Sequence, residues 1–294
     1  MRLEPETQAR PHPYAGGQAA LATMHRKERA IAPTLAEQVG LQVIVPRGLN
    51  TDRLGTFTGE TPRAGTIEEA AIAKARLGMD AAGLPLGLAN EGAYGPHPQI
   101  PFIAAGVELI VLVDDARGLI VKEHIIEEAP HYDHAVVGAG DDLDAFLVRV
   151  EFPETGLIVR PNGRDPIDAP VRKGIREQNA LMAAIRDAAR EAVDGKAFVQ
   201  TDMRAHVNPR RMATLTRLAE RFAARLARLC PDCGAPGYGM VDVESGLPCA
   251  GCGAPSGLVR FEVFGCAACD RHERRPRADG LEAADPRHCH LCNP

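Results

Sequence analysis

Apolar positions along the first 229 residues follow two periods. Short apolar runs are typical of β-strands. Longer segments repeat apolar residues every three or four positions, which is the period of an amphipathic helix. The predicted strands cover residues 19–23, 42–45, 86–89, 108–113, 118–124, 146–152, 156–159 and 198–201, and the predicted helices cover 28–39, 66–80, 171–193 and 209–229.

Strands and helices in this order predict an α/β domain, with a mixed sheet and flanking helices. The fourth and fifth strands are close enough along the chain to form a hairpin, and so are the sixth and seventh. We expect this domain to span residues 15–229. Residues 1–14 are rich in proline and charge, so we expect a flexible N-terminal segment there.

Composition narrows the class of protein. Apolar residues make up 45% of the chain but Trp is absent, so the core must rest on aliphatic side chains. A net charge of −5 favours neither a nucleic-acid partner nor a membrane surface. Apolar runs such as 109–113 are far shorter than the roughly 20 residues that cross a bilayer. Without the apolar stretch of a signal peptide at the start, the chain is expected to be cytoplasmic.

All eight cysteines fall within residues 230–294, in four Cys-x-x-Cys pairs. Each pair presents two sulfurs to one metal, and two pairs complete the tetrahedron that Zn²⁺ accepts. Disulfides are disfavoured in a reducing compartment, and redox Cys-x-x-Cys motifs usually occur singly. We therefore predict a small zinc-ribbon-like module with two structural zinc ions. The predicted ligands are Cys230, Cys233, Cys249, Cys252, Cys266, Cys269, Cys289 and Cys292.

The spacing leaves the pairing of these motifs open. Consecutive pairing fits a zinc ribbon, while a strand-like run at 259–264 also allows nested or cross-braced pairing. Four thiolates per metal leave no open position, so His272, His288 and His290 are not needed as ligands. The module has six arginines against nine acids, so we expect it to stabilise the fold or dock a protein partner rather than bind phosphates.

Candidate chemistry lies at the ends of predicted strands. Serine catalysis is disfavoured because the chain's two serines, Ser245 and Ser256, both lie in the cysteine module. Cations that bind phosphate, beside carboxylates that hold Mg²⁺, would form a site for a phosphate ester or anhydride. The candidate phosphate-binding residues are Lys27, His25, Arg63, Arg204 and His206, and the candidate catalytic residues are Glu91 and Glu60.

Most of these candidates also have a structural interpretation. Lys27 fits a solvated helix face, and Glu60 with Arg63 fits a mutual ion pair. His206 fits the cap of the last helix. Glu91 is harder to explain structurally, because an acid beside a glycine at a strand end indicates a close backbone approach.

A rival metal site is formed in the sequence by His124, His131 and His134, and its alternative is a polar surface loop. The last predicted helix carries arginines at steps of four, four and three residues. They form either a solvated face opposite an apolar stripe or a ridge that binds RNA. These arginines are Arg217, Arg221, Arg225 and Arg228.

Two motifs identify the chain as a member of an uncharacterised bacterial family that is known only as a domain of unknown function. They are Thr-Asp-x-x-Gly-Thr-Phe-Thr-Gly-Glu at Thr51–Glu60 and Glu-Gly-x-x-Gly-Pro-His-Pro at Glu91–Pro98. Membership of this family implies no particular activity.

More distantly, residues 19–228 resemble the inosine/xanthosine triphosphate pyrophosphatases in layout. Residues 23–27 stand where that family has Thr-x-Asn-x-x-Lys, with Thr and Lys but without the Asn. Gly59-Glu60 follows as in the family, and Arg204-Ala205-His206 partly matches its Ser-His-Arg. Its acidic pair at a strand end is represented here by Glu91 alone.

This resemblance implies a metal-dependent nucleotide or phosphate-anhydride hydrolase. Lys27, with Arg204 or His206, would hold phosphates, Glu60 would help to place Mg²⁺, and Glu91 would be a metal ligand or the base for water. The ligand is then a nucleotide or another phosphate-containing small molecule. The alternative is a nucleotide-sensing or partner-docking zinc-ribbon protein without catalytic activity.

Overall fold

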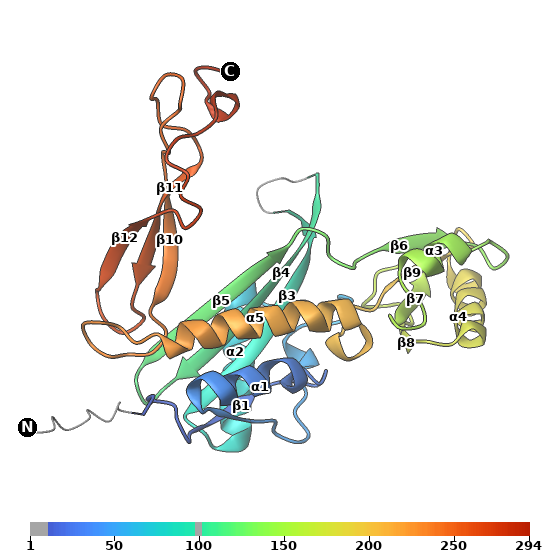
Figure 1. Ribbon diagram of the computed structural model, residues 1–294. Helices are drawn as coiled ribbons and strands as arrows, with labels where there is room; N and C mark the ends of the chain where they lie inside the picture. Colours follow the sequence, from blue (N-terminus) through green and yellow to red (C-terminus); the bar gives the residue numbers. More distant parts are fainter. Residues whose placement is uncertain (1–10, 98–101) are drawn as a thin grey trace, which may run out of the picture. The chain divides into compact units, whose positions relative to one another are not determined.

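The computed structural model describes residues 11–97 and 102–294 of the chain (Figure 1). They form two compact units. The main unit comprises Tyr14–Ala116 and Lys122–Ala223, and the cysteine unit contains Arg117–Val121 and Ala224–Pro294. The expected α/β class with a C-terminal cysteine module is confirmed.

Two sequence predictions fall partly on residues outside the described ranges. Most of the predicted flexible segment lies there, and so does Pro98, the last residue of the motif that begins at Glu91. Tyr14, at the end of the predicted segment, is buried and donates a hydrogen bond from its hydroxyl to Asp114 (3.1 Å).

A five-stranded mixed sheet forms the centre of the main unit, in the order β2-β1-β3-β4-β5. β1 is parallel to β2 and β3, and β3 is antiparallel to β4. The parallel strands are joined through helices α1 and α2, as parallel connections require. The bounds are β1 Gln18–Leu21, α1 Glu28–Val39, β2 Gln42–Ile44, α2 Ile67–Ala82, β3 Leu86–Pro96, β4 Ala104–Asp114 and β5 Leu119–Glu127.

α1 ends at Val39 as predicted, and α2 ends at Ala82, two residues beyond the predicted end at Asp80. α2 begins with a capping box, in which Thr66 accepts from the Glu69 backbone and Glu69 accepts from the Thr66 backbone. Gly40 and Gly83 end α1 and α2 in the left-handed conformation, with φ of 67° and 64°.

Alternation along β3 assigns its side chains to two faces of the sheet. Ala89 and Glu91 lie on the face that α2 covers, where Ala71 and Ala75 form part of the apolar core. Asn90 points to the opposite face, the side on which Figure 1 draws helix α5 (Pro209–Ala227). The predicted end of this strand at residue 89 was wrong, because β4 pairs with β3 as far as Pro96.

A smaller antiparallel sheet, in the order β6-β9-β7-β8, completes the main unit. Helices α3 and α4 pack on one face of it through an aliphatic core that includes Phe146, Leu157, Leu181 and Val199. The bounds are β6 His134–Val137, α3 Asp144–Arg149, β7 Leu157–Pro161, β8 Arg172–Ile175, α4 Gln178–Glu191 and β9 Ala197–Thr201.

Two predictions in this region were wrong. Residues 146–152 were expected to be a strand, but Phe146 and Val150 lie four residues apart and are buried on one side of the short helix α3 and the turn after it. The predicted helix over 171–193 is split into β8 and α4. Gly174, in the left-handed region at φ 71°, is incompatible with a helix at that point.

The cysteine unit contains a three-stranded antiparallel meander of β10 (Gly239–Ser245), β11 (Val259–Gly265) and β12 (His272–Pro276). β11 was predicted, whereas β10 and β12 were not. Among the described residues, no helix has both the length and the apolar character needed to span a bilayer.

Replacing Gly87 with alanine should destabilise the main unit. A Cβ at this position of β3 would lie 2.5 Å from Met79 Cγ and 2.7 Å from the Ala75 carbonyl oxygen on α2, and the backbone oxygen cannot move away cheaply. We expect a loss of about 1–3 kcal/mol in the free energy of unfolding, measured by urea denaturation.

Gly95→Ala on the same strand is the matched control, because nothing lies within 4 Å of the added Cβ. Equal stability of the two variants would contradict the close packing of α2 against β3.

Candidate functional site

A cavity opens where the short strand β1 ends beside the long strand β3. The last pair of β1 with β3 is Leu21 with Leu88, while β3 continues to Pro96. Carbonyl groups farther along this edge of β3 therefore have no neighbouring strand. Two cationic side chains donate to these carbonyl groups instead. Lys27 Nζ donates to the backbone oxygen of Asn90 (2.9 Å), and Arg63 Nη2 donates to the backbone oxygen of Gly92 (2.7 Å).

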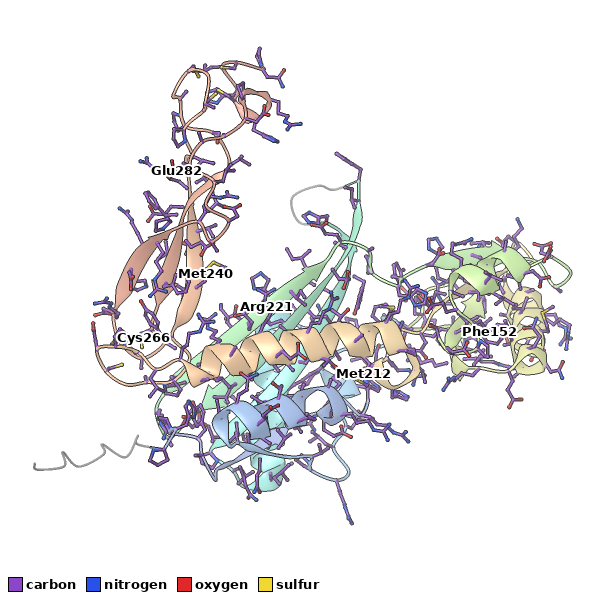
Figure 2. The ribbon with its side chains drawn as sticks, viewed as in Figure 1. Phe152, Met212, Arg221, Met240, Cys266 and Glu282 are labelled. Carbon is purple, nitrogen blue, oxygen red and sulfur yellow. The ribbon has the colours of Figure 1, made fainter. Side chains whose placement is uncertain are left out.

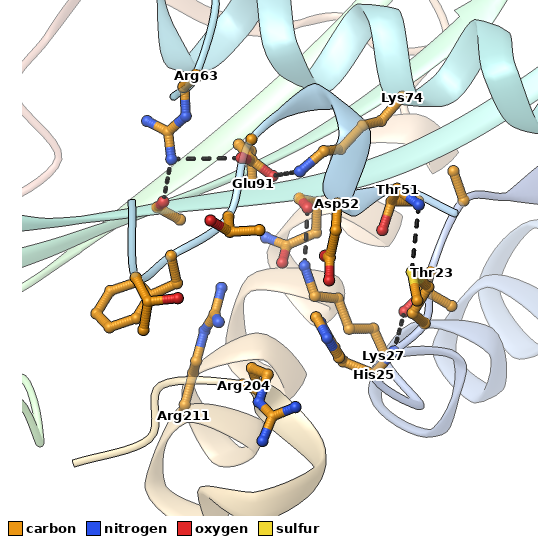
Figure 3. A pocket seen from close by; sticks show the side chains of 18 of the residues that line it. Thr23, His25, Lys27, Thr51, Asp52, Arg63, Lys74, Glu91, Arg204 and Arg211 are labelled. Carbon is orange, nitrogen blue, oxygen red and sulfur yellow. Dashed lines mark hydrogen bonds and ion pairs between the residues drawn. The ribbon is translucent and has the colours of Figure 1, made fainter. Parts of the chain in front are cut away.

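The open space at the cavity, with the solvent at its mouth included, is about 690 Å³, and several cationic side chains line it (Figure 3). Six cationic side chains and two carboxylates line the cavity, and three of the cations pair with carboxylates just outside the lining, Glu60, Asp202 and Glu108, which leaves an excess of one positive charge. The cations are Lys27, Arg63, Lys74, Lys173, Arg204 and Arg211, and the carboxylates are Asp52 and Glu91.

Glu91 is held in place by two of these cations. Lys74 Nζ lies 2.8 Å from Oε2, and Arg63 Nη2 lies 3.3 Å from Oε1. Both Glu91 and Lys74 are buried. Asp52 differs, because within the described part of the chain its carboxylate has neither an ion pair nor a hydrogen bond.

A buried network supports the cavity from the other face of the sheet. Arg211 of α5 donates through Nε to Glu108 of β4 (2.7 Å), and Glu108 also accepts from the Tyr94 hydroxyl. Burial alone would raise the pKa of Glu108, but the Arg211 guanidinium outweighs it and holds that pKa below its ordinary value.

This network orients the amide of Asn90. Its Nδ2 donates to Glu108 Oε2 (3.0 Å) and to the backbone oxygen of Leu109 (2.9 Å). Because both partners are acceptors, the amide nitrogen and not the oxygen must face them. Asn90 lines the cavity and is 1% exposed, and its Oδ1 has no hydrogen-bond partner among the described residues. A buried acceptor left unpaired costs about 1–3 kcal/mol.

Lys27 is poised to change charge near neutral pH. Burial is the main cause that lowers its pKa to about 7, and the charge of Arg211 acts in the same direction. Glu91 and Glu108 act in the opposite direction, and Lys74 lowers the pKa slightly further. The ammonium makes one hydrogen bond, to Asn90, within the described part of the chain, so it can donate further.

Five of the predicted site residues line this one cavity: Lys27, His25, Arg63, Glu91 and Arg204. The imidazole of His25 stays neutral at physiological pH, because burial lowers its pKa to about 3. Arg204 is anchored by the buried Asp202, with Nη2 2.6 Å from Oδ2.

Glu60 and His206 do not line the cavity. Glu60 accepts hydrogen bonds from Thr58 and from Lys173, and Lys173 is a lining cation, so Glu60 acts on the cavity through Lys173. His206 stacks on the ring of His25, with centroids 5.2 Å apart and an interplanar angle of 11°.

The sequence predictions assigned no site role to five lining residues that carry a charge or an amide. For two of them a signal was present. Lys74 lies on the buried alanine stripe of α2, and Arg211 lies four residues before Leu215 on the buried stripe of α5. A single cation on an apolar helix face indicates a buried partner. The missed residues are Asp52, Lys74, Asn90, Lys173 and Arg211.

The rival histidine site is not assembled. Among the described residues, the groups of three or more potential ligands that lie close enough for a metal consist of cysteines. His131 contacts Thr155 through Nδ1 (3.4 Å), and His134 stacks on Phe198 with ring centroids 5.1 Å apart.

The arginine face of α5 is neutralised within the chain. Arg217 pairs with Glu127 of β5, and Arg221 pairs with Glu123 of the same strand (3.4 Å). Arg225, which belongs to the cysteine unit, is buried and donates to the backbone oxygens of Gly237 (3.1 Å) and Met240 (3.0 Å). These contacts favour the structural interpretation of the face over an RNA-binding ridge.

The eight cysteines form two groups of four in the cysteine unit. The first joins Cys230 and Cys233 to Cys266 and Cys269, and the second joins Cys249 and Cys252 to Cys289 and Cys292. Sulfur–sulfur distances between the paired motifs are 3.6 and 3.8 Å in each group. Four sulfurs at the Zn–S distance of about 2.3 Å from a common centre lie about 3.8 Å apart, so each group can hold one zinc ion.

The meander explains this cross-braced pairing. Cysteine pairs alternate with strands along the chain, and antiparallel strands reverse direction each time. The first and third pairs therefore meet at one end of the sheet, and the second and fourth meet at the other. Figure 2 labels Cys266 near one end and Glu282 near the other.

Tight turns aim the sulfurs inward in both groups. Gly234 and Gly253 follow the first and second pairs in the left-handed conformation, with φ of 73° and 74°. Each donates its N–H to the carbonyl of the cysteine four residues earlier, at 2.9 and 2.8 Å. Backbone N–H groups of Cys292 and Leu291 lower the pKa of Cys289 to about 6, whereas hydrogen bonds with Cys252 and Cys249 raise the pKa of Cys292 in the same group to about 12.

A family model described as a domain of unknown function (DUF6671) matches residues 74–294. This is more than half of the chain, so the protein belongs to that family, as its motifs indicated. The match runs through both the main unit and the cysteine unit. No curated protein and no solved structure matches the chain at a significant level. The resemblance to the triphosphate pyrophosphatases is not shown by these comparisons.

Metal analysis of cysteine variants should test the cross-braced pairing. The wild type is expected to hold about two zinc ions per chain, one for each set of four thiolates. Cys230→Ser/Cys269→Ser removes two ligands from one group and should leave about one zinc. Cys230→Ser/Cys249→Ser damages both groups and should leave clearly less than one. Equal metal content in the two double variants would contradict the pairing.

Sulfate binding should report the charge of Lys27, because sulfate does not titrate near neutral pH. A Lys27 pKa of about 7 means that the ammonium is charged at pH 6 and neutral at pH 9. We expect calorimetric sulfate affinity to fall by about tenfold over this interval, as one charge-assisted contact is lost.

Lys27→Met should bind sulfate weakly at both pH values. Arg204→Gln, which removes another lining cation, should weaken binding without removing the pH dependence. Wild-type affinity that does not change between pH 6 and 9 would exclude Lys27 as the titrating group.

Proposed function

We propose that the main unit is a Mg²⁺-dependent hydrolase of nucleotides, acting on a phosphoanhydride bond in the cavity beside β3. The observation that carries this proposal is the lining itself, with six cations and two carboxylates around one space. The expected hydrolase motif alone would not support it, because the second acid of that motif is missing.

The cations supply binding and charge stabilisation. Lys27, Lys173 and Arg204 surround the phosphates and neutralise the charge that develops on the leaving group. Phe57 and Ile158 add apolar surface to the same lining, and Phe57 packs edge-on against Tyr94 (5.6 Å between centroids). An apolar wall beside a phosphate site suits the planar base of a nucleotide.

The two lining carboxylates, Asp52 and Glu91, have different roles in the proposed reaction. Asp52 and Glu91 are the oxygen ligands that fit Mg²⁺, which proteins usually hold through one or two carboxylates together with substrate phosphates. When bound, the ion would polarise a phosphoryl oxygen. Figure 3 shows Asp52 on the same side of the cavity as Lys27, and Asp52 is unpaired within the described residues, whereas Glu60 is already bound to Lys173. We therefore assign to Asp52 the part in magnesium binding that was expected of Glu60.

Glu91 is the base for the attacking water. The water oxygen bonds to phosphorus, Glu91 accepts the proton, and the phosphoanhydride P–O bond breaks to release the leaving phosphate or pyrophosphate. Lys74 and Arg63 hold the Glu91 carboxylate in one orientation for this transfer.

A second function is favoured by one feature of the same site. Both oxygens of Glu91 are already engaged by cations, as in a structural ion pair. The cavity would then sense a nucleotide without turning it over, and the cysteine unit would dock a protein partner. Under either function we expect a cytoplasmic protein in which the two zinc ions are structural.

Phosphate and pyrophosphate release should be measured with zinc-loaded protein, Mg²⁺ and a panel of ordinary and deaminated nucleoside triphosphates. Glu91→Gln removes the base but keeps the shape, so we expect turnover to fall by about 10²–10⁴-fold while nucleotide binding persists. Asp52→Asn should raise the Mg²⁺ concentration needed for half-maximal rate.

Asp115→Asn is the matched control, because this exposed carboxylate pairs with Arg76 and does not line the cavity. Nucleotide binding without turnover by the folded wild type would favour the sensor. Absence of both binding and turnover would exclude both functions.

A further inference from the structure

A second cationic surface adjoins the cavity across the His25–His206 pair. It is a groove of about 490 Å³, and the rings of His25 on the cavity side and His206 on the groove side stack 5.2 Å apart. The two sites therefore share a wall that is one pair of rings thick. The groove is lined by Arg26, Arg29, Glu154, Arg176, Ala205, His206, Pro209 and Met212.

The turn between β1 and α1 serves both sites. His25 and Lys27 line the cavity, whereas Arg26 between them lines the groove. Arg26 adopts a φ of 57°, in the left-handed region that a non-glycine residue rarely occupies. Strain of this kind is retained where the surrounding structure over-determines the conformation, and it clusters at functional sites.

The guanidinium groups of the groove have little internal compensation. Within the described residues, the side chains of Arg26 and Arg29 make neither an ion pair nor a hydrogen bond, and Arg176 donates to the Pro153 carbonyl (2.9 Å). On α5, by contrast, Arg217 and Arg221 are paired with acids of β5. Glu154 is the one carboxylate in the lining, so the groove keeps an excess of positive charge.

We propose that the ligand of the main unit is a phosphodiester-linked chain of at least two nucleotides, with its terminal phosphate in the cavity and its next phosphate in the groove. The proposal rests on the phosphate binding inferred for the cavity, but not on hydrolysis. Arginine forks suit the second phosphate, because a guanidinium can donate two parallel hydrogen bonds to its oxygens. Because the whole chain has a net charge of −5, we expect phosphate contacts at this cationic groove and not over the rest of the surface.

The test compares three 3′-fluorescein-labelled thymidine ligands with a 5′-phosphate: a mononucleotide, a dinucleotide and a hexanucleotide. Binding is followed by fluorescence anisotropy without Mg²⁺, so that no ligand is consumed. We expect the dinucleotide to bind about tenfold more tightly than the mononucleotide, the gain of one charge-assisted contact. Arg29→Gln/Arg176→Gln should abolish this gain, leave mononucleotide affinity unchanged and reduce the salt slope for the dinucleotide by about 0.7.

Arg186→Gln is the matched control, because this exposed arginine of α4 lines neither the cavity nor the groove. Arg26→Gly is a second variant that accepts the same left-handed turn while removing the guanidinium, and it should lose the gain without loss of stability. A hexanucleotide that binds like the dinucleotide identifies a small dinucleotide ligand, and one that binds more tightly identifies a nucleic-acid strand.

Equal affinity for the mononucleotide and the dinucleotide would overturn the inference and leave the cavity as a mononucleotide site. A gain that survives in Arg29→Gln/Arg176→Gln would overturn it as well. Failure of the hydrolase proposal looks different, because the dinucleotide would still bind through the groove arginines while no nucleotide was turned over.

Discussion

The site depends on a mismatch in strand length. β1 ends at Leu21, opposite Leu88, whereas β3 is kept extended to Pro96 by its full pairing with β4. Backbone carbonyls on the exposed edge of β3 must find donors, since an unpaired buried carbonyl is costly. Lys27 and Arg63 provide them. The early end of β1 therefore has two effects: it opens the cavity, and it leaves β3 carbonyl groups that cationic side chains must satisfy.

Once cations are buried beside β3, the rest of the network follows from electrostatics. A buried charge without a partner is strongly destabilising, so Lys74 is matched by Glu91 and Arg211 by Glu108. Lys173 is matched in the same way by Glu60, and Arg204 by Asp202. Lys27 is the lining cation that pairs with a backbone carbonyl instead of an acid, so it is the one best placed to gain from a bound anion.

The cysteine unit is governed by a different constraint. Its small meander buries little apolar surface, and Val241 and Val243 of β10 are 47% and 43% exposed. The two groups of four cysteines close the ends of the sheet instead. Metal binding at such sites contributes folding free energy directly, because the sites do not exist in the unfolded chain. One unit is thus held together by an aliphatic core, and the other by its cysteine groups.

The sequence by itself determined the local features. Apolar periodicity located α1 and α2 to within two residues at each end, and the grouping of the cysteines indicated metal sites before any pairing was known. It also placed Lys27, His25, Arg63, Glu91 and Arg204 among the candidates that line one cavity. These features depend on neighbouring residues along the chain, which is why they can be recognised in the sequence.

Tertiary structure decided what depends on distant partners. Whether β3 stops at residue 89 or continues to Pro96 is set by β4, and whether Val150 belongs to a strand or to the end of a helix is set by the core it meets. Lys74 and Arg211 become site residues because α2 and α5 pack on opposite faces of the sheet, and the cysteine pairing follows from strand direction. Contacts between residues far apart in the chain are chosen by the packing of whole elements, and no local pattern specifies them.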